Sequence, residues 1–141
     1  MNVLVTGAKG FVGKNLVANL KNIRDGKDRT TDLDSDLNIF EYDLDTDQTM
    51  LETYCESADF VFHLAGVNRP KDQSEFMSGN YGFTSTLLAT LKKHVNNCPV
   101  MLSSSTQAML DNPYGHSKKA GEDLLFSYSK ETGAKVLVYR F

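Results

Sequence analysis

The sequence of 141 residues predicts an α/β fold in which a doubly wound parallel sheet forms the core. Short apolar runs alternate along the chain with segments whose apolar residues recur at helical spacing. Residues 3–5 are an uninterrupted apolar run, as in a parallel strand covered on both faces. Two polar stretches, residues 6–13 and 103–118, each follow a predicted strand, and open α/β sheets bind ligands at the carboxyl ends of their strands.

Three glycines connect the first predicted strand to the first predicted helix, which we end near Asn22. Gly7 permits a tight turn, Gly10 lets a pyrophosphate approach the backbone, and Gly13 lets the helix pack close to its strand. The free N–H groups at the start of that helix would face the phosphates. The order strand, glycine turn, helix favours a dinucleotide-binding turn over a glycine-rich turn without a ligand.

The second predicted strand, residues 38–43, ends in acidic residues. Asp43 is followed by Leu44 and Asp45. A carboxylate at this place accepts hydrogen bonds from an adenosine ribose and favours NAD, whereas an arginine favours NADP. The alternative is that Asp45 or Asp47 caps the next helix, and the residues alone do not decide between the two.

The third predicted strand, residues 60–66, ends in small residues. After Leu64, the side chains of Ala65 and Gly66 leave room for a ribose at the edge of the sheet. We interpret His63 as a packed core histidine rather than a catalytic one.

The next turn carries Asn68 and Arg69. In a parallel sheet this turn lies on the ligand edge, so Arg69 either meets a phosphate or is a solvated loop charge. A long helical pattern follows over residues 74–95, with interruptions expected at Gly79 and Gly82.

The second informative stretch follows the predicted strand at residues 99–103. Tyr114 opens a helix, and Lys118 lies four residues later on the same helix face. The Lys118 ammonium would favour the phenolate form of Tyr114, which suits the tyrosine to acid–base catalysis. A serine at this strand end can hydrogen-bond the carbonyl or hydroxyl group on which Tyr114 acts.

The helix that begins at Tyr114 is predicted to end at Gly133, and a last strand covers residues 135–139. Strands that alternate with helices imply right-handed crossovers between parallel strands. The length fits one domain, residues 1–141.

Composition excludes several function classes. A net charge of -3 and a pI near 5.5 argue against a nucleic-acid surface, and the apolar runs are too short to span a membrane. Cys55 and Cys98 are expected to be reduced thiols, and no ligand spacing predicts a metal site. Because Met1 leads directly into a strand, we expect no signal peptide and a cytoplasmic location.

The motifs resemble those of the extended short-chain dehydrogenases/reductases, the nucleotide-sugar epimerases, dehydratases and reductases. They are residues 6–13 (TGAKGFVG), 63–66 (HLAG), 103–105 (SSS) and 114–118 (YGHSK). The resemblance implies a Rossmann-like fold, of which this chain would be the N-terminal, cofactor-binding part only.

A closer resemblance is to the CapF family of capsular polysaccharide enzymes, also called WbjC. It is carried by residues 65–70 (AGVNRP), 102–108 (LSSSTQA), 111–115 (DNPYG) and 135–141 (KVLVYRF). That family implies a homodimer that reduces a UDP-4-keto-6-deoxy-N-acetylhexosamine with NADPH on the route to UDP-N-acetyl-L-fucosamine. It also implies a substrate domain and a zinc cupin domain. We therefore expect this chain to be a fragment, inactive or feeble alone.

The resemblance also implies residue roles. Tyr114 would protonate the C4 oxygen, and Lys118 would tune Tyr114 and hold the nicotinamide ribose. Ser105 would polarise the carbonyl, with Ser104 as the second choice for that role. The positions it places at the cofactor are Gly7, Gly10, Phe11, Val12, Gly13, Asp43, Leu44, Leu64, Ala65, Gly66, Tyr114 and Lys118. Asn68 and Arg69 match the family, but no role follows for them.

The cofactor and the reaction each keep alternatives. The family has an arginine where Leu44 stands, so the acidic neighbours Asp43 and Asp45 keep NAD(H) open beside NADP(H). A nucleotide-sugar 4-epimerase and a non-catalytic NAD(P)-binding module are the alternative functions. A 4,6-dehydratase is disfavoured because it would carry acidic residues where Thr106 and Gln107 stand.

Overall fold

A five-stranded, parallel sheet in the order β2-β1-β3-β4-β5 forms the centre of the computed structural model, which describes residues 1–33, 36–67 and 69–141. The strands are β1 (Asn2–Thr6), β2 (Asn38–Tyr42), β3 (Phe60–His63), β4 (Val100–Ser104) and β5 (Val136–Arg140). The helices are α1 (Phe11–Arg24), α2 (Thr49–Ser57), α3 (Ser74–Phe76), the π-helix η1 (Met77–Gly82), α4 (Phe83–Lys93), the 3-10 helix η2 (Thr106–Met109) and α5 (Pro113–Thr132). The predicted fold class is confirmed.

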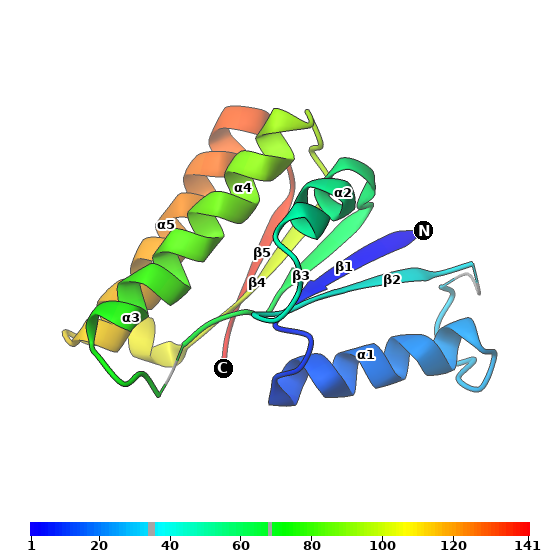
Figure 1. Ribbon diagram of the computed structural model, residues 1–141, viewed down its shortest axis with the longest axis horizontal. Coiled ribbons are helices and arrows are strands. Elements are labelled where there is room, and N and C mark those ends of the chain that lie inside the picture. The colour runs from blue at the N-terminus through cyan, green and yellow to red at the C-terminus, as the bar shows by residue number, and fades with distance from the viewer. Residues whose placement is uncertain (34–35, 68) are drawn as a thin grey trace.

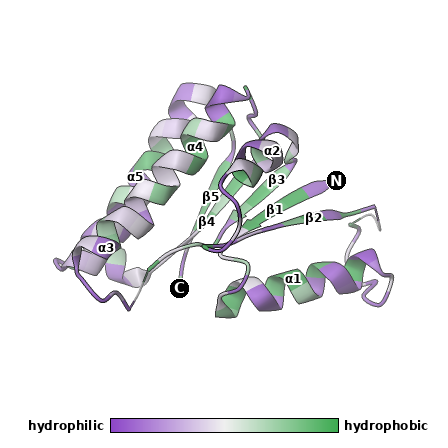
Figure 2. Cartoon of the chain, viewed as in Figure 1, coloured by the Kyte–Doolittle hydropathy of each residue, from purple (hydrophilic) through white to green (hydrophobic). Residues whose placement is uncertain are grey.

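The sheet is covered on both faces, with α1 on one side and α2, α4 and α5 on the other (Figure 1). Val3 and Val5 pack toward α1, whereas Leu4 between them packs into the core on the opposite face. A strand in this position needs an apolar side chain at every residue, which is why the sequence shows no alternation there. Figure 2 shows hydrophobic residues concentrated in the strands and hydrophilic ones mixed into the helices.

Two predicted elements differ from the structure in an informative way. The strand expected over residues 60–66 ends at His63, because its neighbour β1 ends at Thr6 and offers no further hydrogen-bond partners after the bond from Leu64 N to Thr6 O. The helix expected over residues 74–95 is interrupted, as predicted, around Gly79 and Gly82, where η1 replaces regular α-helix. Within the described ranges, no helix is long and apolar enough to cross a membrane.

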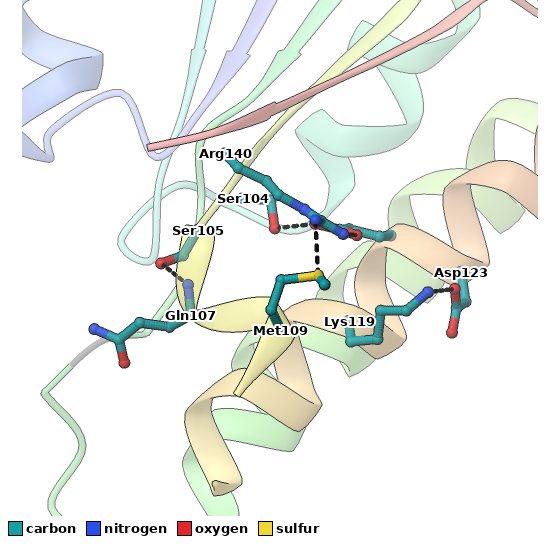
Figure 3. A network of polar contacts seen from close by, with 8 residues as sticks. Ser104, Ser105, Gln107, Met109, Lys119, Asp123 and Arg140 are labelled. Carbon is teal, nitrogen blue, oxygen red and sulfur yellow. Dashed lines mark hydrogen bonds and ion pairs between the residues drawn. The ribbon is translucent and has the colours of Figure 1, made fainter. Parts of the chain in front are cut away.

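An ion pair between the buried Glu122 and the exposed Arg140 joins β5 to α5, and Ser104 connects it to β4. Glu122 in α5 is only 1% exposed, and its carboxylate accepts hydrogen bonds from Arg140 Nη2 at 2.7 Å and Nε at 2.9 Å. The Ser104 hydroxyl donates to the same carboxylate at 2.7 Å (Figure 3). The Arg140 guanidinium lowers the pKa of Glu122, which is therefore ionised at neutral pH. The last strand is thus held by a satisfied buried charge.

Substitution of Glu122→Gln should lower the free energy of unfolding at neutral pH, because Arg140 and Ser104 would lose the charged acceptor of their hydrogen bonds. Since the folded-state pKa of Glu122 is lowered, its stabilising contribution is lost as the pH falls through that pKa. Urea unfolding of the wild type and the Glu122→Gln variant should show that their difference in the free energy of unfolding becomes smaller at acidic pH.

The matched control is Asp123→Asn, which removes the neighbouring carboxylate from its exposed pair with Lys119 (Figure 3). An exposed pair of this kind contributes about 0.5 kcal/mol or less. An equal decrease in the free energy of unfolding for the Glu122→Gln and Asp123→Asn variants would contradict the stabilising role assigned to Glu122.

Candidate active site

The strand order places a crevice between β1 and β3. From β1 the chain passes to β2 on one side and then to β3 on the other, and α/β sheets bind ligands at such a switch point. Two adjoining cavities of about 380 and 540 Å³ open there. The residues that line both are Gly7, Gly10, Leu64, Gly66 and Val67. The two cavities therefore form one elongated crevice.

The glycine turn forms the floor of this crevice. Gly7 has a φ of +69°, and a Cβ there would lie 2.7 Å from Ala65 N. A Cβ on Gly13 would overlap the Gly7 carbonyl oxygen, so only glycine lets α1 approach β1 this closely. Gly10 is the N-cap residue of α1, and its backbone is extended. Because glycine has no side chain, Gly10 makes no capping hydrogen bond to the first turn. The backbone N–H groups of the first turn are thus available to an anion, and Phe11 and Val12 of this turn line the smaller cavity.

The larger cavity ends at the acidic residues after β2. Asp43 lines it and accepts hydrogen bonds from Lys9 N at 2.8 Å and Leu44 N at 2.7 Å. Asp45 instead pairs with the Lys9 ammonium, and Asp47 accepts from Thr49 N at the start of α2. The sequence did not distinguish the roles of these three carboxylates, but in the structure their surroundings differ. Of the three, only Asp43 borders the cavity. Leu44 lines the rim fully exposed.

The smaller cavity unites the predicted catalytic residues with the glycine turn. Ser105, Tyr114 and Lys118 all line it, together with Gly7 and Gly10. The Lys118 ammonium lies 5.7 Å from the centroid of the Tyr114 ring, and burial lowers the pKa of Lys118. The Tyr114 hydroxyl has no hydrogen-bond partner among the described residues. It is therefore free to bond a ligand.

Ser104 and Ser105 differ in their hydrogen bonds (Figure 3). Ser104 donates its proton to the buried Glu122 carboxylate. Ser105 Oγ accepts from Gln107 N at 3.1 Å, and its own proton has no acceptor in the described part of the chain. Only Ser105 therefore has a proton to donate to a ligand, which supports it as the first choice of the two.

Asn80 was not identified from the sequence, although it holds the site together. It lies in η1, and its side chain bonds Val67 N at 2.8 Å, Val67 O at 3.0 Å and Ser117 Oγ at 3.0 Å. A Cβ on Gly66 would lie 2.8 Å from Asn80 Oδ1 and 3.0 Å from Lys118 Nζ. Gly79 and Gly82 predicted an interruption of the helix near Asn80, but they did not predict its π-helical geometry, which is often found at functional sites.

His63 is fully buried, as predicted, and joins the ends of β1 and β3 to η1. Its Nδ1 lies 2.7 Å from Thr6 Oγ1 and its Nε2 lies 2.8 Å from Thr84 Oγ1. Because Thr84 donates to Asn80 O and Thr6 accepts from Ala65 N, the proton on the imidazole lies on Nε2 and Thr6 donates to Nδ1. The chain of bonds therefore runs unbroken from the Ala65 loop to η1.

The remaining predictions fall outside this crevice or outside the described chain. Arg69 is exposed and lines a separate cavity, which shares Tyr114 with the crevice. Asn68 lies outside the described residues. Cys55 and Cys98 are buried, free thiols, and burial raises their pKa values to about 12 and about 11. In the described ranges, no three His, Cys, Asp or Glu side chains are grouped to hold a metal ion.

The His63→Gln variant should be less sensitive to acid than the wild-type chain. Burial, assisted by the Lys118 charge, lowers the pKa of His63 to about 3, against about 6.5 in the unfolded chain. Below about pH 6.5, His63 therefore binds a proton in the unfolded state but stays neutral in the folded state. The free energy of unfolding of the wild type falls as the pH drops below about 6.5. Urea unfolding at about pH 7 and about pH 5 should show a smaller decline for the variant.

The control for this prediction is His116→Gln, which removes an exposed histidine on α5. Its acid sensitivity should resemble that of the wild type. An acid-induced decline of equal size in the His63→Gln variant would show that His63 is not the buried group responsible.

Comparison with known proteins places these features in a family context. A relative from Pseudomonas aeruginosa, UDP-2-acetamido-2,6-beta-L-arabino-hexul-4-ose reductase, is 38% identical over 140 residues, covering 99% of this chain and 35% of the relative. The crystal structure of the capsular polysaccharide assembling protein CapF from Staphylococcus aureus is 45% identical with a TM-score of 0.80, covering 100% of this chain and 35% of CapF. This chain therefore spans about a third of both relatives.

A more distant structure shares the fold. RMD from Pseudomonas aeruginosa, complexed with NADPH, has a TM-score of 0.73 at 23% identity, covering 99% of this chain and 53% of RMD. Residues 3–141 match the NAD dependent epimerase/dehydratase family. Because this match spans the sheet, the glycine turn and the Ser–Tyr–Lys side of the crevice, the chain belongs to the NAD dependent epimerase/dehydratase family.

Proposed function

We propose that this chain is the cofactor-binding and catalytic part of a nucleotide-sugar oxidoreductase that reduces the C4 ketone of a UDP-4-keto-6-deoxy-N-acetylhexosamine. The observation that carries the proposal is one cavity lined by the glycine turn and by Ser105, Tyr114 and Lys118. The similarity to a UDP-2-acetamido-hexulose reductase and to CapF supports this substrate class. Homodimerisation and a cytoplasmic location stay predictions of the sequence.

The crevice fits a nicotinamide dinucleotide, which supplies the hydride when bound. The first turn of α1 would hold the diphosphate, and the lack of a side chain at Gly10 would let the diphosphate approach the backbone. Asp43 lines the end where an adenosine ribose would lie. This end carries Lys9 as well as acidic residues, so NADH and NADPH are both retained as cofactors.

The side chains divide the proton chemistry among them. The Ser105 hydroxyl donates a hydrogen bond to the ketone oxygen, because its own oxygen already accepts from Gln107 N. The Tyr114 hydroxyl gives its proton to that oxygen as the alcohol forms. The Lys118 ammonium beside the ring then stabilises the phenolate that remains.

A Tyr114→Phe variant should separate a reductase from a non-catalytic binding module. Loss of the proton donor should slow ketone reduction by about 100-fold or more, while the affinity for the cofactor should stay unchanged. Single-turnover oxidation of NADPH or NADH by the ketone, with protein in excess, would measure even a slow reaction of the chain alone.

The control variant is Tyr139→Phe, because Tyr139 is an exposed tyrosine on β5 and does not line the crevice. It should react as the wild type does. Equal, measurable rates of ketone reduction for the wild type and the Tyr114→Phe variant would contradict the proposal.

A further inference from the structure

The larger cavity of the crevice ends at Asp43, where an adenosine ribose would lie. NADH and NADPH differ only at this ribose, where NADH has a 2′-hydroxyl group and NADPH has a 2′-phosphate with about two negative charges. Lys9 from the glycine turn and Asp43 are the charged side chains among the described residues that line this cavity. The choice between the two cofactors therefore depends on how these two charges are balanced.

Asp43 presents a fixed carboxylate to the ribose end of the cavity. Its Oδ2 accepts a hydrogen bond from Lys9 N at 2.8 Å, and its Oδ1 accepts one from Leu44 N at 2.7 Å. A carboxylate can accept about four hydrogen bonds, so about two positions stay open to ribose hydroxyls. The same two bonds occupy backbone N–H groups that could otherwise bind a phosphate. Asp43 therefore accepts from a 2′-hydroxyl group and repels a 2′-phosphate.

Lys9 could offset this repulsion, but its ammonium is held by Asp45. The ammonium donates to the Asp45 carboxylate in an ion pair, and Asp45 is not among the described residues that line the cavity. The hydrogen bond between them raises the pKa of Lys9 and lowers the pKa of Asp45, so both groups are charged at neutral pH. Because Asp45 neutralises Lys9, the charge of Asp43 stays unbalanced at the ribose end.

The rest of the described cavity wall offers no second cation to a phosphate. Leu44 is fully exposed at the rim, but its side chain is apolar and its N–H already bonds Asp43. Lys118, which lines the smaller cavity, does not line the larger one. A 2′-phosphate at this end would therefore meet an unbalanced carboxylate and a lysine that is already paired.

We infer, on the basis of the proposed function, that this chain binds NADH in preference to NADPH and that Asp45 sets this preference by holding Lys9. Asp45 acts without touching the cofactor, as a positioning residue for Lys9. Without the Asp45 charge, the Lys9 ammonium would be free to meet a 2′-phosphate as a point charge.

Titrations with NADH and NADPH, followed by nicotinamide fluorescence, test this inference. The wild-type chain should bind NADH about tenfold more tightly than NADPH. The Asp45→Asn variant should lower this affinity ratio by about threefold or more, because Lys9 becomes available to the phosphate, while its affinity for NADH stays close to that of the wild type. Added salt should reduce the preference of the wild type, since Lys9 and Asp45 are both exposed.

The matched control is Asp47→Asn, which removes the same negative charge from the same loop. The Asp47 carboxylate accepts from Thr49 N and does not pair with Lys9, so this variant should keep the affinity ratio of the wild type. Addition of Lys9→Ala to the Asp45→Asn variant should restore the preference for NADH. This reversal would show that Asp45 acts through Lys9, because a general structural effect of Asp45→Asn would not depend on Lys9.

Two results would overturn the inference. One is tighter binding of NADPH than of NADH by the wild type, and the other is an equal affinity ratio for the Asp45→Asn and Asp47→Asn variants. Equal, measurable ketone reduction by the wild type and the Tyr114→Phe variant, with a preference for NADH that still depends on Asp45, would contradict only the proposed reaction.

Discussion

The close approach of α1 to the carboxyl ends of β1 and β3 is the constraint on which the site depends. It requires Gly13 against the Gly7 carbonyl and Gly7 against the Ala65 backbone, where no Cβ fits. The approach brings the uncapped first turn of α1 to the switch point of the sheet. An anion-binding helix terminus and the loop after β3 thereby share one crevice, and every cofactor residue expected from the sequence lines it.

Buried polar groups hold the other side of that crevice in place. The His63 chain joins the loop after β3 to η1, and Asn80 joins η1 to α5. Glu122 joins α5 to Arg140 and Ser104. Each buried side-chain polar atom in the described residues has a hydrogen-bond partner, so these networks impose no unpaired group on the core. These hydrogen bonds connect α5, which carries Lys118, to η1 and to the end of β4 beside Ser105.

The sequence predicted what depends on local spacing. The glycine turn, the Tyr114–Lys118 helix face and the Gly133 C-cap, with its φ of +77°, follow from residues that are neighbours along the chain. The interruption of the long helix was predicted as well, but its π geometry and the role of Asn80 were not. Asn80 acts through Val67 and Ser117, which spacing along the chain cannot bring together.

The surroundings of individual charged side chains could be assigned only from the three-dimensional structure. Asp43, Asp45 and Asp47 look alike in sequence, and only tertiary contacts assign one to the cavity, one to Lys9 and one to the start of α2. Arg69 was expected at the ligand edge, either on a phosphate or in solvent. The structure places it in a cavity that shares Tyr114 with the crevice. A sequence pattern cannot show a cavity lined by three separate segments.

A titration of the purified chain with NADPH and NADH, followed by nicotinamide fluorescence, tests the central claim most directly. The account predicts saturable binding of at least one cofactor. It also predicts weaker binding by the Gly10→Ala variant, because a methyl group there would hinder the approach of the diphosphate to the backbone. The added Cβ would lie 3.3 Å from Gly7 O, which requires a small local shift. Gly82→Ala, where the nearest atom is at 3.9 Å, should bind as the wild type does. Absence of binding to the folded wild-type chain, or equal affinity of the Gly10→Ala variant, would contradict the account.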